Sequence, residues 1–313
     1  MQYNNNAQLD TSVVEDARSS GGGVGRGGLA VGGGGLGLVG LIVVVLINVL
    51  GGGGGTTGLP GGIGGLSGVG TGTNVSSVDN SQLAGSCKTG KDANSNTDCA
   101  LVADIESIEG YWTQTMPSLN GQYVHSPTRF FRGQTDTGCG SATSGVGPFY
   151  CPADKKVYID LAFFDELKTQ FGATGGPFVN AYVLAHEYGH HIQDLLGTEA
   201  KINHTATGAK SDSVRLELQA DCYAGVWANH ATTVASANGQ PFILDLTQAD
   251  INAALDTAGR IGDDWIQSHL GGGGVDQSKF THGSSAQRQK WFGAGYQTGR
   301  PTACDTFGAA NLG

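Results

Sequence analysis

Five consecutive residues at positions 186–190, HEYGH, constrain the fold of this chain more than any other part of its sequence. They lie in the segment 177–196, which begins with a proline and is followed by Gly197. Proline in a first turn and glycine after a last turn are helix start and stop signals. The two histidines are four residues apart, so on a helix they face the same side and can bind one metal ion. The fold must therefore bring a further ligand against the middle of this helix.

Glu187 indicates the chemistry that a metal ion at this position would support. It lies about 100° around the helix axis from its neighbour His186, beside the ligand face. Zinc lowers the pKa of a bound water, and a nearby glutamate can then accept the proton while the water attacks a carbonyl. We therefore identify Glu187 as a candidate general base. The alternative, two surface histidines on a soluble helix, is disfavoured because H-E-x-x-H is rare by chance.

A catalytic zinc site usually has three protein ligands and a water. The metzincin pattern would place glycine and histidine at positions that hold Gln193 and Leu196, so that class is excluded. Glu217 and Asp221 are four apart in the apolar segment LELQADCYAGVWA, and 26 residues separate Glu217 from His190. That length allows one helix to end and a second to return. We assign Glu217 as third ligand and Asp221 as the carboxylate that accepts the N–H of a ligating histidine.

These two segments together resemble those of a known class of enzymes. HEYGHHIQDLLG, at 186–197, and ELQADCYAGVWA, at 217–228, resemble the gluzincin metallopeptidases, and most closely the bacterial neutral zinc metallopeptidase family. The resemblance extends to the segments 137–167 and 281–299, and it covers roughly residues 100–307.

The resemblance implies a zincin fold, Zn²⁺ as cofactor and endopeptidase activity on a peptide or protein substrate. Residue by residue, it implies zinc ligation by His186, His190 and Glu217 and a general-base role for Glu187. An apolar anchor near the N-terminus is also typical of the family.

Such a peptidase needs a hydrogen-bond donor for the oxyanion of its tetrahedral intermediate. We choose His282, which precedes a capped helix in the family-like segment 281–299. The other candidates are His269, Tyr223 and His191. His191 points about 100° away from its neighbour on the helix, which favours a packing role. The remaining histidines, in polar or turn contexts, are expected at the surface: His125, His204 and His230.

The rest of the domain that carries these motifs is expected to be mainly helical, with a small strand component. Hydrophobic spacing and capping residues predict helices over 100–117, 163–171, 177–196, 211–237, 248–270 and 285–298. The segment 157–161, VYIDL, alternates as a strand does. As an edge strand it would hold an extended substrate by strand addition. The fold class we predict is α+β, mainly α, with a zincin-like domain.

The first quarter of the chain has a different composition. It holds 25 of the 54 glycines in residues 1–75, whereas of the 24 aromatic residues only Tyr3 precedes Tyr111. Such a segment lacks the bulky groups that a core needs. We therefore divide the chain into a disordered tail, 1–28, a transmembrane anchor, 29–50, a Gly/Ser-rich linker, 51–85, and the metallopeptidase domain, 86–313.

The anchor is predicted from 22 uncharged residues, which as a helix cross about 30 Å of hydrocarbon. A cleaved signal peptide is the alternative, but no cleavage site of the A-x-A kind follows. Arg18 and Arg26 precede the span, and the next basic residue is Lys88. The positive-inside rule then predicts a single-pass cell-membrane protein with a cytoplasmic N-terminus and an extracytoplasmic catalytic domain.

Six cysteines follow the predicted anchor, an even number that suggests disulfides in an exported domain. Sequence alone leaves 15 pairings open. The simplest expectation, from equal local spacings, is Cys87–Cys99 and Cys139–Cys151, which leaves Cys222–Cys304. A zinc ribbon is disfavoured because the chain has no C-x-x-C pair.

A net charge of −10 without a cluster of Lys and Arg argues against nucleic acid as a partner. The function we expect is a membrane-anchored zinc-dependent endopeptidase. A catalytically silent zincin that serves as an envelope binding or scaffolding protein is the main alternative, and an intact Glu187 argues against it. A structural zinc site in an envelope adhesin is a third reading, which the sequence leaves open.

Overall fold

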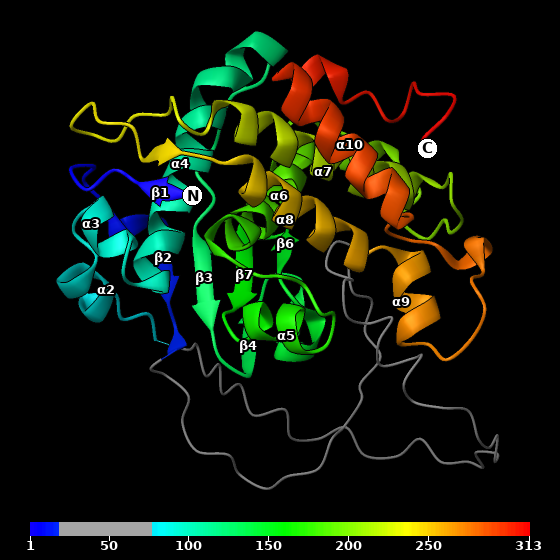
Figure 1. The fold of residues 1–313 in the computed structure, drawn as a ribbon, viewed down its shortest axis with the longest axis horizontal. Helices are drawn as coiled ribbons and strands as arrows, with labels where there is room; N and C mark the ends of the chain where they lie inside the picture. Colours follow the sequence, from blue (N-terminus) through cyan, green and yellow to red (C-terminus); the bar gives the residue numbers. More distant parts are fainter. Residues whose placement is uncertain (19–76) are drawn as a thin grey trace, which may run out of the picture.

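The computed structural model describes residues 1–18 and 77–313, which form a four-stranded sheet covered on one face by helices (Figure 1). The strand order is β2 (Val14–Asp16), β3 (Thr128–Phe131), β7 (Lys156–Asp160) and β6 (Phe149–Cys151). The first three are parallel, and β6 is antiparallel to β7. β6 and β2 are therefore the two edges of this sheet.

Three helices of 19 residues each provide most of the helical layer: α4 (Thr97–Thr115), α6 (Pro177–Leu195) and α7 (Asp212–His230). The last long helix, α10 (Ser285–Thr298), lies against α7. Glycines allow this close approach, because a Cβ at Gly225 would clash with the carbonyl oxygen of Phe292 and one at Gly295 with that of Cys222. The C-terminal helix is thus fixed against the middle of α7.

Smaller elements complete the described chain. The short helices are α2 (Ser81–Ser86), α3 (Gly90–Ala93), α5 (Phe163–Thr169), α8 (Gln248–Arg260) and α9 (Asp263–His269). Two further strand pairs are β1 (Gln2–Tyr3) with β8 (Ile243–Asp245), and β4 (Gln134–Thr137) with β5 (Gly140–Thr143). Six 3-10 turns are η1 (Thr11–Val13), η3 (Met116–Leu119), η4 (Ser144–Val146), η5 (Glu199–Lys201), η6 (Gln277–Lys279) and η7 (Pro301–Ala303).

The alternation of side chains along the strands separates two apolar clusters. Val157 and Ile159 of β7 face the helices and join the main core, whereas Tyr158 faces away from it. Tyr158 belongs to a smaller cluster with Phe131 and Ala142, beneath the β4–β5 hairpin. The predicted mainly helical α+β class is confirmed.

Most predicted elements are present, and the differences have local causes. The helix expected over 248–270 divides into α8 and α9 at Ile261–Gly262, because Gly262 adopts an extended backbone (φ −75°, ψ 146°) that interrupts the helix. The helix expected over 211–237 ends at His230, before the β-branched residues 232–234. The region 118–155, for which the sequence predicted no helix or strand, holds β3 to β6.

The expectation that 157–161 is an edge strand is wrong. β7 lies inside the sheet, paired with β3 on one side and β6 on the other, so its backbone groups are already used. Alternation and β-branching predict a strand but carry no information about its neighbours.

All three expected disulfides are present. They join Cys87 to Cys99, Cys139 to Cys151 and Cys222 to Cys304, and no described cysteine is free. The first ties α2 to α4, the second ties the β4–β5 turn to the edge strand β6, and the third ties α7 to the C-terminal segment.

Residues 1–18 correct the expectation of a disordered tail over 1–28. β2 pairs in parallel with β3, and Glu15 of β2 forms ion pairs with Arg129 and Lys156. Tyr3 is 2% exposed, and its hydroxyl donates to the buried carboxylate of Asp104. The segment has few apolar residues, but sheet pairing and these contacts provide partners for its polar groups. Hydrophobic periodicity in a sequence gives no information about such polar contacts.

The described residues that flank the stretch 19–76 lie next to each other in the fold. The N–H of Asp79 donates to the carbonyl of Asp16 at 2.8 Å, and the Asn80 side chain donates to the carbonyl of Val14 at 2.6 Å. Residues 1–18 and 77–313 are therefore on one side of any membrane. The single-pass arrangement, with the N-terminus and the catalytic domain on opposite sides, is wrong for the chain folded in this way.

The predicted transmembrane anchor, 29–50, lies outside the described residues, as do most of the tail's second half and of the 51–85 linker. Within 1–18 and 77–313 there is no helix that combines the length and the apolar character needed to cross a bilayer.

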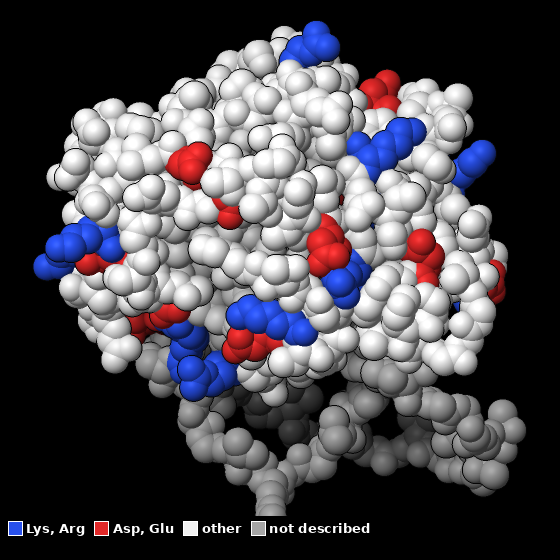
Figure 2. Space-filling model, viewed as in Figure 1, with Lys and Arg blue, Asp and Glu red and all other residues white. Residues whose placement is uncertain are grey.

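Charged side chains are dispersed over the surface. On the face shown in Figure 2, Lys and Arg lie singly, many of them beside Asp or Glu, and they form no continuous basic patch. Arg18, for example, lies 2.6 Å from Asp16 and 2.7 Å from Asp98.

Replacing Tyr3 by Phe should destabilise the whole domain. The change leaves the buried carboxyl group of Asp104 without its hydroxyl partner, which costs about 1–3 kcal/mol. Urea unfolding measures the loss, with Gln8→Ala, an exposed residue of the same segment, as the control. Equal unfolding free energies for Tyr3→Phe and wild type would show that the N-terminal segment does not belong to the folded unit.

Candidate metal centre

The residues of the two sequence motifs meet where α6 crosses α7. Gly189 makes this crossing close, because a Cβ there would lie 2.9 Å from the Cα of Ala220. His186 and His190 extend from α6 toward Glu217 of α7, and one ligand atom from each of the three lies within 4.8 Å of the others. All three side chains are buried. The three ligand atoms therefore lie close enough together to bind one metal ion without any movement of the helices.

The distances show which atoms converge. Nε2 of His186 lies 3.1 Å from Oε2 of Glu217, and Nε2 of His190 lies 3.6 Å from Oε1 of the same carboxylate. Both imidazoles thus present their Nε2 atoms to one carboxylate. Two imidazole nitrogens and a carboxylate oxygen form the His₂Glu ligand set of catalytic zinc sites.

The other ring nitrogen of each histidine has its own partner. Nδ1 of His186 contacts Oδ1 of Asp221 at 2.9 Å, and Nδ1 of His190 contacts Oε1 of Gln193 at 2.8 Å. Gln193 is held by donating to the carbonyl of Leu216 at 2.7 Å. Such partners fix the tautomer and ring orientation of metal-binding histidines. The contact expected for Asp221 is present, and the donor set fits zinc.

Asp221 is the most completely partnered carboxylate of this group. It is fully buried, and besides His186 it accepts a hydrogen bond from the Tyr182 hydroxyl at 2.6 Å. Arg288 of α10 donates to both of its oxygens, through Nε at 2.8 Å and Nη2 at 3.0 Å. Burial would raise the pKa of Asp221, but Arg288 and His186 lower it to about 2. Asp221 is therefore held as a carboxylate.

Burial and charge act in opposite directions on the three ligand residues. Burial would lower the pKa of His186, but the carboxylates of Asp221 and Glu217 raise it to about 10. Burial lowers the pKa of His190 to about 4 despite the nearby Glu217. Burial would raise the pKa of Glu217, but the two histidines lower it well below its usual value. Without a metal, Glu217 is thus ionised and His186 holds a proton, which a metal ion at the same ligand atoms would replace.

Glu187 lies beside this group without belonging to it. Its side chain is 2% exposed, and burial, together with repulsion from Glu217, raises its pKa to about 7. The backbone N–H of Tyr150, on the edge strand β6, interacts with its carboxylate. A carboxylate whose pKa lies near neutrality, next to a metal-binding group, suits a proton acceptor.

His282 is buried, and its electrostatic interaction with Glu217 places it near the ligand group. Its Nδ1 lies 3.3 Å from Oδ1 of Asp263, and the other oxygen of Asp263 accepts the backbone N–H groups of Thr281, His282 and Gly283 at 2.7–2.8 Å. Burial would lower the pKa of His282, but Asp263 raises it. The structure thus holds His282 in one orientation.

The other oxyanion candidates lie elsewhere. His269 is exposed and stacks on Trp265. Tyr223 packs against Trp112. His191 has the packing role expected of it, because both its ring nitrogens are used, by the Tyr150 hydroxyl and by the carbonyl of Val124.

Of the three histidines expected at the surface, His125 is exposed as expected, whereas His204 and His230 are half-buried. His125 contacts Glu109, His204 contacts the carbonyl of Glu199, and His230 contacts the carbonyl of Gly299. None of them belongs to the ligand group.

Sequence reasoning missed four residues that support the site: Tyr182, Gln193, Asp263 and Arg288. Two of them carried a usable signal, because Tyr182 is four residues before His186, and Gln193 three after His190, each on the ligand face of α6. Asp263 and Arg288 carried none, since their contacts depend on how α9 and α10 pack against the site.

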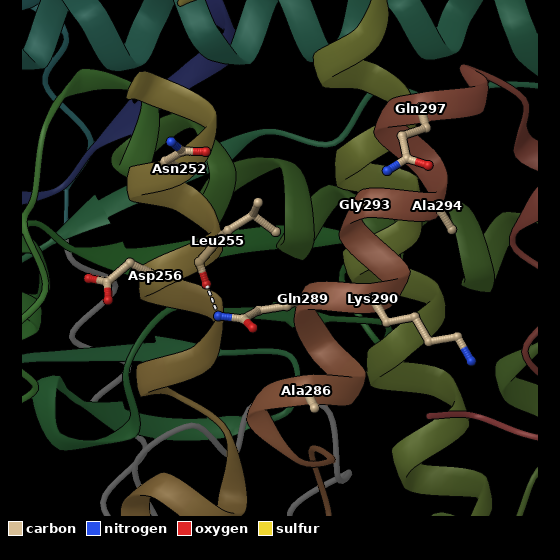
Figure 3. Close-up of a pocket in the computed structure, with 9 residues that line it drawn as sticks. All are labelled: Asn252, Leu255, Asp256, Ala286, Gln289, Lys290, Gly293, Ala294 and Gln297. Carbon is tan, nitrogen blue, oxygen red and sulfur yellow. Dashed lines mark hydrogen bonds between the residues drawn. The ribbon is translucent and has the colours of Figure 1, made fainter. Parts of the chain in front are cut away.

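A surface groove between α8 and α10 is separate from the ligand group (Figure 3). It encloses about 860 Å³, and Gln289 donates across it to the carbonyl of Leu255 at 2.9 Å. Gln289 follows Arg288 in sequence, so it lies about 100° further around α10 and faces this groove, whereas Arg288 faces Asp221. The groove lining holds no histidine or cysteine.

Known proteins are similar to this chain in sequence. The family described as "Putative neutral zinc metallopeptidase" matches residues 1–307. The uncharacterized protein Rv2575 of Mycobacterium tuberculosis is 51% identical over 228 residues, which are 72% of this chain and 76% of that protein. The uncharacterized protein YpfJ of Escherichia coli K12 is 39% identical over 308 residues, 96% of each chain. No solved structure matches the chain.

Replacing Arg288 by Met should strongly destabilise the domain. It leaves the fully buried Asp221 carboxylate without its guanidinium partner, and breaking a buried ion pair in this way costs about 3–5 kcal/mol. Lys290→Met, on the exposed side of the same helix, is the control. The double variant Asp221→Asn/Arg288→Met should recover part of the loss in urea unfolding. Equal stabilities of Arg288→Met and Lys290→Met would contradict this account.

Proposed function

Because the chain belongs to the neutral zinc metallopeptidase family, we propose that it is a zinc-dependent endopeptidase in which His186, His190 and Glu217 hold the metal. The observation that carries the proposal is the buried His₂Glu group whose two remaining ring nitrogens are already partnered, with Glu187 next to it. A zinc ion in this position supplies Lewis-acid polarisation of a carbonyl and of a water molecule.

Glu187 is the general base in this proposal. Its carboxylate takes the proton of the attacking water and delivers it to the leaving amine, a role for which a pKa near 7 is suited. Its burial excludes bulk water from this proton transfer.

His282 is the proposed hydrogen-bond donor to the oxyanion. Its Nδ1 faces Asp263, which leaves Nε2 for the substrate. The raised pKa of the imidazole favours the protonated form, which is the stronger donor to developing negative charge.

The substrate is a peptide or protein that we place along β6 and not, as the sequence suggested, along β7. β6 pairs with β7 on one side only among the described strands. The backbone N–H of Tyr150 on β6 reaches Glu187, so a peptide added to this edge would pass the ligand group.

A catalytically silent zincin that acts as a binding or scaffolding protein remains the alternative. A silent protein has no use for a buried carboxylate whose pKa is raised toward neutrality beside the ligands, and Glu187 is such a group. A purely structural zinc site is disfavoured for the same reason.

We also propose that the domain works outside the cytoplasm, attached to the cell membrane through the apolar segment 29–50. Three disulfides support an oxidising compartment. Because residues 1–18 and 77–313 share one sheet, both ends of such an attachment have to lie on the domain's side.

Glu187→Gln should keep zinc and fold but abolish hydrolysis of casein or a quenched peptide, because it removes the proton acceptor and no ligand. His186→Ala and His190→Ala should lose both zinc and activity. Metal analysis and peptide cleavage distinguish these cases. Stoichiometric zinc in either histidine variant, or Glu187→Gln activity within about tenfold of wild type, would defeat the proposal.

His282→Phe should lower kcat by about 10²–10³, the effect of removing one oxyanion donor, while zinc content stays constant. Asp263→Asn should lower kcat by less, because the ring stays in place and loses only its charge partner. His269→Phe, at the exposed candidate, is the control. An unchanged kcat in His282→Phe would assign the donor role to another group.

Labelling from outside should show that the N-terminal segment and the catalytic domain share a compartment. Asn5→Cys and Lys279→Cys, both at exposed positions, should react equally with an impermeant thiol reagent on intact cells or spheroplasts. Reaction at residue 279 alone would restore the single-pass arrangement.

A further inference from the structure

The ligand face of α6 continues one turn beyond the metal centre. Asp194 follows His190 by four residues and therefore lies on the same face, about 6 Å further along the helix axis. Its side chain is 23% exposed. The hydroxyl of Tyr150, from the edge strand β6, donates to it at 2.8 Å. Asp194 is thus in the last turn of the metal-binding helix, where it contacts the strand proposed to bind the substrate.

A second carboxylate, Glu199 of η5, lies beside it. Glu199 is 6% exposed, its Oε1 atom is buried, and no hydrogen bond reaches this atom. Burial raises its pKa to about 8, with further contributions from the charges of Asp194 and Glu217. Glu199 also acts electrostatically on Tyr150. These interactions place the unpartnered carboxyl group within electrostatic range of Tyr150, Asp194 and the ligand Glu217.

The chain supplies little positive charge to this pair. Among the described residues, the cation that forms an ion pair with either carboxylate is Lys155, whose half-exposed Nζ lies 3.8 Å from Asp194. The buried Arg288 is fully used by Asp221 and its neighbours. With a pKa near 8, Glu199 is largely protonated at neutral pH, and a cationic ligand beside it would stabilise its ionised form.

We propose that Asp194 and Glu199 form a subsite for a cationic nitrogen of the substrate, either a Lys or Arg side chain or a free N-terminal amino group. The inference rests on the proposed peptidase function and names the substrate class that it favours. A second metal ion is disfavoured, because among the described residues only His186, His190 and Glu217 gather at metal-ligand distances.

The test uses the zinc-loaded full-length protein and quenched peptides of one sequence. Lysine or norleucine is placed at successive positions around the cleaved bond, each with a free or an acetylated N-terminus. Wild type should cleave the best lysine peptide with a kcat/KM about tenfold above its norleucine counterpart. If acetylation leaves this preference intact, the subsite takes a side chain. If the preference instead requires a free N-terminus, it takes the terminal amino group.

Glu199→Gln and Asp194→Asn should reduce the preference towards one while the norleucine peptide is cleaved within about twofold of wild type. Asp245→Asn, an exposed acid on β8, is the matched control and should change nothing. Glu199→Gln should also keep its zinc and its Tm, because the side chain keeps its size and no hydrogen bond to Oε1 is lost.

Three results would overturn the inference. The first is a wild type without preference for a cation at any position, and the second is a Glu199→Gln variant that retains the preference. The third is a lower Tm of Glu199→Gln with selectivity unchanged, which would make the carboxyl group structural. Cleavage of the norleucine peptides separates this failure from that of the proposed function. Absence of all cleavage defeats both.

Discussion

The buried ion pair between Asp221 and Arg288 connects most of what defines this site. Asp221 lies on α7, and through His186 and Tyr182 it fixes α6, while Arg288 brings α10 to the same point. A buried carboxylate in this position is tolerated only because three donors surround it. The same contacts set the orientation of the His186 ring, so the stability of the helical layer and the geometry of the metal centre depend on one set of atoms.

The metal centre also depends on small residues and on the sheet. Gly189 and Ala220 let α6 and α7 approach closely enough for the side chains of His190 and Glu217 to reach one metal site. β6 brings Tyr150 against the other side of α6, where its backbone faces Glu187 and its hydroxyl faces Asp194. The site is therefore a three-sided arrangement of two helices and one strand edge.

Short-range periodicity predicted the part of the site that lies on single helices. His186, His190, Glu217 and Asp221 were identified because residues four apart share a face, and the disulfide partners followed from spacing. The strand order could not be predicted, since alternation does not specify which strand is internal, and β7 was misplaced at an edge. Arg288 and Asp263 reach the site only through tertiary packing. The N-terminal strand β2 lacks any apolar pattern, and its pairing with β3 is visible only in the folded chain.

The disulfide between Cys222 and Cys304 spans 82 residues and begins next to Asp221. Arg288, His282 and Cys304 all belong to the last part of the chain, whereas the ligands they support come from its middle. A protein synthesised from its N-terminus therefore cannot assemble a supported metal centre until almost the entire chain has emerged. The order of residues in the sequence thus delays maturation, so that a protease of this design would acquire its metal and its activity only when synthesis and export are nearly finished.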